Sequence, residues 1–506
     1  MTPVLPARPA SARVLRALGA ALLPLLAGGC LSMAPDYQRP AAPVPTAYEQ
    51  APTAGAEAPA AATVGWRDYY TDPILQDLID GALRNNRDLR TALLRVEEAR
   101  ALYGIQRADQ FPTIGVQADG SRARVPGDLN LTRQPQISSQ YQVGIGMASW
   151  ELDFWGRVRS LKDAALQNYL ASDAAARAAT LSLITQVADG YLTLRELDER
   201  LALTRATIAS RAESLRIFKR RFEVGAISRL DLTQVETLWQ QATALGADLE
   251  QSRAAQAHAL ALLAGGPLTL PPAGARLDDA AVMLDLPAGL PSDLLANRPD
   301  IVAAEHRLKA ANANIGAARA AFFPSIPLTG AYGTASAELD GLFDSGSRAW
   351  SFAPRLSLPI FDAGRRAAAL DLAETRRDQA VAGYEKAIQS AFRDVSDALS
   401  ARRWLAEQVQ VLRATVAAQG ERARLAQLRY DHGASPYLEV LDAQRDLLAA
   451  QQKLVQTRRA LLSSRVGLYA ALGGGTRPPS APATPATPAT SATSADAAPS
   501  APVRGQ

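Results

Sequence analysis

The chain has 506 residues, of which 48% are hydrophobic and 6% aromatic, so it can bury a sizeable core in more than one domain. Its 54 lysines and arginines exceed the 50 acidic residues by only four. Three of these bases, Arg8, Arg13 and Arg16, stand among the first 29 residues, which contain no acidic residue. The rest of the chain is close to neutral. It gives no support to nucleic-acid binding, because that function normally needs a concentrated basic surface.

Residues 1–29 have the pattern of a secretory signal peptide, with a basic start and an apolar run over residues 17–27 that is shorter than the roughly 20 residues of a membrane helix. Cys30 follows as the only cysteine, so it cannot form an intramolecular disulfide. Its place in LLAGGC resembles a bacterial lipoprotein signal, although Ala27 stands where leucine is usual. This resemblance implies a covalent lipid on Cys30 and no other cofactor, and Leu31 is compatible with sorting to the outer membrane. The alternative is a buried free thiol near an ordinary cleavage site.

The rest of the sequence is duplicated, and its halves meet near residue 290. In both halves Asn-Arg and a following aspartate lead into a helical pattern that closes on Phe-Pro, at Phe111-Pro112 and Phe323-Pro324. Further on, WELDFWGRVRS and LPIFDAGRRAA each place a glycine, Gly156 or Gly364, just before a very long helix. We therefore predict the following segments: a signal peptide (1–29), an acylated extended segment (30–65), two repeats of helix, two strands and long helical hairpin (66–290 and 291–475), and a disordered tail rich in Pro, Ala, Thr and Ser (476–506).

Two very long helices are predicted over residues 157–223 and 365–430, because neither stretch contains a proline. Each would be about 100 Å long. Apolar residues recur in both at three- and four-residue steps, the narrow seam that coiled-coil packing needs. They are Ile184, Val187, Tyr191 and Leu194 in the first helix, and Val381, Tyr384, Ile388, Ala391, Val395 and Leu399 in the second. Shorter helices return over 230–263 and 438–472, so the chain forms two antiparallel hairpins.

The hairpin tips are two similar turns, RFEVGAISRLDLTQVE and RYDHGASPYLEVLDAQ. Gly225 and Gly433 stand at the same point of each copy. We predict that both glycines adopt the left-handed conformation that ends a long helix.

Four stretches with strand-like alternation, near residues 113–119, 140–150, 326–332 and 350–360, are expected at the other end of the hairpins. Alternation alone fits a sheet on a soluble core equally well. The export signal favours a membrane sheet, because no later segment holds the apolar run of a membrane helix and these stretches suit tilted membrane strands. Four strands cannot close a barrel with a lumen, and lipid does not tolerate unpaired edges, so several chains would share their strands.

Several motifs make the chain similar to the outer-membrane efflux channels of the TolC/OprM family, in particular to OprM-type multidrug efflux lipoproteins. They are PDYQRP, WRDYYTDPILQDLI, IQRADQFPTIGV, WELDFWGR, LPSDLLANRPDI, IGAARAAFFPSI, YEKAIQSAF and the ending from LDAQR to LYAALGGG, and they cover about residues 30–475. The resemblance implies a mixed α and β fold: a homotrimer whose outer-membrane β-barrel has twelve strands, four per chain, continued by a periplasmic α-helical coiled-coil barrel. It also implies passive conduction, with a periplasmic adaptor (membrane fusion) protein and an inner-membrane resistance-nodulation-division pump as partners.

The resemblance further implies a periplasmic gate at the hairpin tips. Glu439 and Asp442 match positions that form acidic rings at the family's constriction, and Leu438 matches an apolar ring. Helical spacing puts Leu438 and Asp442 on one face. Like charges crowded around a three-fold axis would favour cations and raise carboxylate pKa values. The alternative is a solvated acidic face near a helix start, where the helix dipole favours carboxylates.

Other tip residues match family positions that hold or dock the hairpins. Asp231 and Tyr430 match positions that tie neighbouring hairpins together in the closed state. Ser435 stands where TolC has its clasp arginine, and Arg229 is close enough in sequence to substitute. Family tips also dock the adaptor, which gives these contact candidates: Val224, Gly225, Ala226, Gly433 and Ala434.

The sequence offers no catalytic or metal site. His258, His306 and His432 are scattered without the paired spacing of metal ligands, and phosphate-binding and nucleophile-elbow motifs are absent. Two other interpretations stay open. One is the same architecture serving type I protein secretion or metal-ion efflux, and the other is a periplasmic coiled-coil scaffold.

Overall fold

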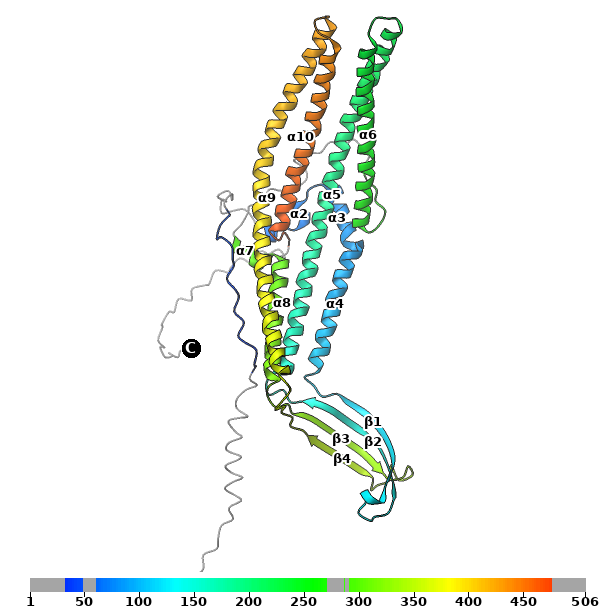
Figure 1. Ribbon diagram of the computed structural model, residues 1–506, viewed down its shortest axis with the longest axis vertical. Coiled ribbons are helices and arrows are strands. Elements are labelled where there is room, and N and C mark those ends of the chain that lie inside the picture. The colour runs from blue at the N-terminus through cyan, green and yellow to red at the C-terminus, as the bar shows by residue number, and fades with distance from the viewer. Residues whose placement is uncertain (1–31, 49–60, 271–285, 287–290, 476–506) are drawn as a thin grey trace, which may run out of the picture.

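The computed structural model describes residues 32–48, 61–270, 286 and 291–475. The molecule is elongated, with a four-stranded sheet at one end and the tips of two helical hairpins at the other (Figure 1). The predicted signal peptide, Cys30 and the 476–506 tail lie outside the described residues, so these three assignments stay predictions.

The two repeats have the same order of elements. The first contains η1 (Ala61–Thr63), α2 (Trp66–Tyr69), α3 (Pro73–Asn85), α4 (Arg87–Ala108), β1 (Ile114–Val125), η2 (Gly127–Leu129), β2 (Gln136–Glu151), α5 (Arg157–Glu223) and α6 (Arg229–Ala264). The second contains α7 (Pro291–Asn297), α8 (Pro299–Ala320), β3 (Pro327–Ser336), β4 (Arg348–Pro354), α9 (Arg365–Asp431) and α10 (Tyr437–Ala471). In each repeat a helix, two strands and a long hairpin follow one another.

The long helices α5 and α9 agree with the sequence prediction, and both have 67 residues. Each begins after a glycine in the left-handed conformation, Gly156 with φ of 70° or Gly364 with φ of 83°. An upstream carboxylate then accepts a hydrogen bond from the first turn, as Asp153 does from the amide of Arg159 at 2.8 Å. The predicted seams are confirmed, with Val381 only partly buried against the core and the following residues buried: Ile184, Val187, Tyr191, Leu194, Tyr384, Ile388, Ala391, Val395 and Leu399.

Helix α5 is central to the bundle. It packs against α6 and α10 toward the tips and against α4 and α8 toward the sheet, while α9 packs against α10 and α8 (Figure 1). The largest apolar core lies midway, where α2 and α3 cover the long helices. There Tyr69 stacks on Tyr469 with ring centroids 4.2 Å apart. None of the helices described is both long and apolar enough to cross a membrane.

The sheet is antiparallel throughout, in the order β1-β2-β3-β4. Strands β1 and β2 extend beyond the predicted stretches, because the polar run after residue 119 still pairs with β2 although it lacks alternation. Strand β4, expected to reach residue 360, ends at Pro354. Pro354 and Pro359 have no N–H to donate to a ladder, and only a single bridge between Ser325 and Ser357 follows. The predicted end of β4, residue 360, was therefore wrong by six residues.

The return helix of each repeat ends at a glycine pressed against the start of that repeat. Gly265 has φ of +75°, and a Cβ there would lie 2.3 Å from the carbonyl oxygen of Asn85. Gly473 has φ of +74°, and its Cβ would lie 2.7 Å from the carbonyl oxygen of Asn297. These two close approaches hold the hairpins to the middle of the molecule.

We expect Gly265→Ala to destabilise the folded protein by about 1–3 kcal/mol, because it combines a left-handed backbone with a backbone clash. The measurement is the melting temperature of the detergent-solubilised protein. Gly266→Ala is the matched control, since a Cβ on Gly266 meets nothing within 4 Å. Equal melting temperatures for the two variants would contradict this packing.

Candidate functional site

One face of the sheet is apolar and exposed. The strand register places Val116, Ile145, Tyr332 and Trp350 side by side in one row across all four strands. These side chains are between 56% and 80% exposed. The row on the opposite face contains Gln117, Gly144, Gly333 and Ala349, which are small or polar. A contiguous apolar surface of this kind marks a face that packs on lipid or on another protein.

The two outer strands of the sheet each have one partner in the described part of the chain. β1 pairs with β2, and β4 pairs with β3. Their other edges present backbone N–H and C=O groups that need partners, most urgently where the surroundings are lipid. A neighbouring copy that pairs β4 with its own β1 would satisfy both edges.

An N-terminal strap, residues 32–48, lies along α8 and α9 and leads to the sheet end of the molecule (Figure 1). Tyr48 stacks on Phe392 with ring centroids 5.0 Å apart. Further along, the side chain of Asn312 donates a hydrogen bond to the carbonyl oxygen of Pro35 at 2.7 Å. Gly316 lacks a side chain where the strap passes, since a Cβ there would lie 2.7 Å from the nitrogen of Ala34.

Glu305 is the charged anchor of this strap. Its carboxylate is buried and accepts hydrogen bonds from Arg39 at 2.6 Å and from the hydroxyl of Tyr37 at 3.2 Å. Lys309 lies 2.9 Å away on the same helix. Burial opposes the charge of Glu305, but the hydrogen bonds from Lys309 and Arg39 outweigh it, so its pKa lies below the ordinary value. Burial, and to a smaller extent the carboxylate of Glu305, raises the pKa of the Tyr37 hydroxyl to about 12.

The two hairpin tips have the same backbone geometry. Gly225 and Gly433 have φ of +74° and +73°, which confirms the predicted left-handed conformation. Each tip also carries the same pair of hydrogen bonds, in which the amides of Ala226 and Ala434 donate to the carbonyls of Arg221 and Arg429 at 2.9 Å and 2.8 Å. The contact candidates Val224, Gly225, Ala226, Gly433 and Ala434 are all exposed, so their side chains and backbone are accessible to another protein.

The acidic gate candidates are paired with arginines of the same chain. Glu439 lies 3.2 Å from Arg429, and Asp442 lies 3.1 Å from Arg445. Leu438 precedes them and is 45% exposed. The sequence had suggested crowded, uncompensated carboxylates, but these ion pairs neutralise much of the charge within each chain. Repulsion between three copies would be correspondingly weaker.

Tyr430 forms a latch between the two hairpins, but its partner differs from the one suggested by the sequence. The guanidinium of Arg221 on α5 donates a hydrogen bond to the hydroxyl of Tyr430 on α9. Arg229, the expected substitute, instead lies over the ring of Phe222 at 5.6 Å. Asp231 is held in its own hairpin, where it forms a capping box with Ser228 at the start of α6. Within this chain, therefore, the arginine that bonds Tyr430 is Arg221, and the hydroxyl of Ser435 forms no hydrogen bond with either residue.

An aromatic cluster supports the latch. Tyr437 packs on Tyr430 with ring centroids 4.8 Å apart and on Phe218 at 4.5 Å. Its hydroxyl donates to that of Ser214 on α5 at 2.8 Å, and burial raises its pKa. Neither these contacts nor the bond of Arg221 to Tyr430 was predicted from the sequence. The available signal for Arg221 was that it occupies the same position as Arg429 in the two copies of the turn.

The described residues contain no group of three or more His, Cys, Asp or Glu side chains that could hold a metal ion. Of the three histidines, His306 has a polar partner, the side-chain oxygen of Gln167 at 2.7 Å from Nδ1. His258 and His432 lie on α6 and just after α9 and are not brought together with it.

Two long segments of the chain, residues 78–266 and 290–474, match the family described as outer membrane efflux protein. The chain belongs to this family. The solvent efflux pump outer membrane protein SrpC of Pseudomonas putida is 48% identical over 89% of this chain and 96% of its own length. Outer membrane protein OprJ of Pseudomonas aeruginosa is 45% identical over 90% of this chain and 95% of its own. The open state of the Neisseria gonorrhoeae MtrE outer membrane channel has a TM-score of 0.80 at 42% identity, covering 88% of this chain and 99% of that one.

Family membership makes this protein an efflux channel of the outer membrane of a Gram-negative bacterium, and not an enzyme. It also confirms the mixed α and β channel fold and overturns the alternative of a periplasmic coiled-coil scaffold. The relatives are outer-membrane components of efflux pump systems. The roles of individual tip residues rest on the geometry above.

We expect Arg221→Ala to raise the conductance of the channel in planar lipid bilayers. Loss of one hydrogen bond worth about 1 kcal/mol would favour the open gate about fivefold per latch. Tyr430→Phe should act in the same direction, because it removes only the hydroxyl. Arg220→Ala is the control, since Arg220 pairs with Glu223 on its own helix. If all three variants conduct like the unmodified protein, the latch does not hold the gate.

Proposed function

We propose that three copies of this chain form a multidrug efflux duct, in which twelve strands close a barrel through the outer membrane. The single observation that supports this best is the apolar row of Val116, Ile145, Tyr332 and Trp350 on a sheet with two open edges. A closed barrel satisfies the edge groups and turns the apolar face toward lipid. Four strands per chain and three-fold symmetry meet both needs.

The duct conducts passively, and its energy comes from a partner. Relatives named as solvent and toluene efflux pump outer membrane proteins support a role beside an inner-membrane pump. We assign that role to a resistance-nodulation-division pump, joined to the exposed hairpin tips by a periplasmic adaptor. Docking there would break the latch between Arg221 and Tyr430 and let the tips splay apart like an iris.

A lipid on Cys30 would give the protein a second attachment to the membrane, in addition to the barrel. The strap leads from Tyr48 to residue 32 at the sheet end of α8, where Gly316 makes room for it. Only Leu31 separates Ser32 from Cys30, so the two Cα-to-Cα steps between them can span at most about 7 Å. A lipid on Cys30 would therefore lie close to the level at which the barrel enters the membrane.

Deletion of the gene in its host should cause hypersensitivity to several unrelated hydrophobic drugs, because such compounds would no longer leave the cell. The measurement is the minimum inhibitory concentration, and complementation with the intact gene is the control. Unchanged susceptibility in a host without a redundant channel would refute the drug duct. Increased sensitivity to metal ions alone, or loss of a secreted protein, would instead favour metal-ion efflux or type I secretion.

Labelled palmitate should be incorporated by the intact protein and not by Cys30→Ser. We expect the unlipidated variant to stay in the outer membrane, because the barrel inserts without help from the lipid. The readouts are radiolabel in the purified protein and membrane fractionation. Equal labelling of both proteins would exclude Cys30 as the acylated residue.

A further inference from the structure

A cavity of about 780 Å³ lies midway along the molecule, between α5, α9, the end of α10 and the start of α8. This volume falls in the range of pockets that hold drug-sized molecules. Much of the wall is apolar or small, with Leu181, Ala398, Ala401, Val466 and Ala470 among the lining residues. No residue of the hairpin tips or of the sheet lines it.

The cavity opens on one side of the helix bundle. On α5, Ile184, Val187 and Tyr191 face the core that α3 covers. Ser182, Gln186 and Asp189 follow one another on the opposite face of α5, and these three residues line the cavity. These α5 residues of the lining therefore lie on the face opposite the α2 and α3 layer, and we take this face to line the conduit of the proposed trimer.

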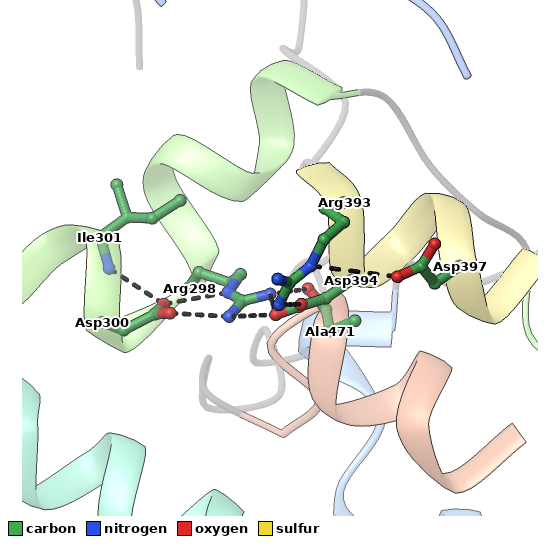
Figure 2. Close-up of polar contacts among 7 residues, drawn as sticks. All are labelled: Arg298, Asp300, Ile301, Arg393, Asp394, Asp397 and Ala471. Carbon is green, nitrogen blue, oxygen red and sulfur yellow. Dashed lines mark hydrogen bonds and ion pairs between the residues drawn. The ribbon is translucent and has the colours of Figure 1, made fainter. Parts of the chain in front are cut away.

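The one arginine in the lining is already fully engaged. Figure 2 shows Arg298 between two carboxylates, with Asp300 at 2.7 Å and Asp394 at 3.2 Å. Arg298 also donates to the carbonyl oxygen of Ala471 at 3.4 Å, and its side chain is only 12% exposed. It has no exposed positive charge to offer to a ligand.

The negative charges of two other aspartates in the lining are compensated little by arginines of the described chain. Asp397 is 76% exposed, and its nearest cation is the guanidinium of Arg393 at 3.9 Å (Figure 2). Asp189 accepts a hydrogen bond from the hydroxyl of Ser463 and, within the described residues, has no ion-pair partner. Arg393, just outside the lining, also pairs with Asp394 at 2.8 Å, so four aspartates stand against two arginines and the cavity keeps excess negative charge.

This charge is not needed to hold the end of the return helix to the start of its own repeat. At the equivalent point of the first repeat, the neutral side chain of Asn86 donates to the carbonyl oxygen of Leu263 at 2.9 Å. Arg298 makes the corresponding contact to Ala471 in the second repeat. A neutral amide is therefore sufficient for the structural task, and the acidic group around Arg298 is additional.

We propose that this cavity is a transit site on the conduit wall for singly charged, amphipathic organic cations. The apolar walls receive the hydrophobic body, and Asp397 and Asp189 face its charge. Because the site is open and its carboxylates are partly solvated, it binds the cation weakly. Weak binding is required of a site along a conduction path, since the cargo has to leave it again. This inference rests on the proposed function, because it takes the cavity to face the conduit.

The test uses the full-length trimer in lipid nanodiscs, with ethidium as the cationic probe and neutral N-phenyl-1-naphthylamine as the comparison. Binding is followed by fluorescence anisotropy at low ionic strength. We expect Asp397→Asn to weaken ethidium binding about three- to tenfold, the effect of one short-range charge in a partly solvated site. The affinity for the neutral probe should not change, and added salt should reduce the difference.

Two further variants complete the design. Asp378→Asn, a matched control on the same helix, removes an exposed aspartate that pairs with Arg377 outside the cavity, and should leave ethidium binding intact. Ala401→Phe should fill the cavity and abolish saturable binding of ethidium without dissociating the trimer. If Asp397→Asn and Asp378→Asn bind ethidium alike, or if Ala401→Phe binds normally, the transit site is refuted. The drug-susceptibility experiment is separate, so either result stands without the other.

Discussion

The backbone groups along the outer edges of β1 and β4 impose the constraint from which the rest of the architecture follows. The sheet carries an exposed apolar row, and a sheet in lipid has no water to satisfy its edges. A single chain can solve neither problem. The duplication within the chain provides four strands and two hairpins from one folding pattern, and in the proposed trimer three-fold association would complete barrel and tube together.

The tip region combines weak contacts of different kinds. The ion pairs of Glu439 with Arg429 and of Asp442 with Arg445 are exposed, and such pairs contribute little to stability on their own. The aromatic contacts of Tyr437 and the hydrogen bond to Tyr430 join the two hairpins more directly. In the proposed gate, contacts of this kind would give a modest barrier to opening, which suits a channel that opens when a partner docks.

The helices were readable from the sequence because their signals are local. Absence of proline, a recurring apolar seam and a glycine at each end determine α5 and α9 almost to the residue. Strand ends were less readable, since the polar end of β1 is fixed by pairing with β2, while Pro354 stops β4 early. The latch could not be chosen in advance, because the sequence does not show which arginine of the first tip, Arg221 or Arg229, approaches Tyr430 of the second. Only the packing of α5 on α10 brings Arg221 to Tyr430.

The length of the long helices has a mechanical consequence. A helix of 67 residues is about 100 Å long, and the half of α5 beyond the midway core, about 50 Å, can act as a lever whose fulcrum lies at that core. A tilt of roughly 5° at the fulcrum displaces the far end by roughly 4 Å over that half. Such a displacement exceeds the length of a hydrogen bond. Large movements at the mouth of the tube therefore require almost no rearrangement where the protein meets the membrane.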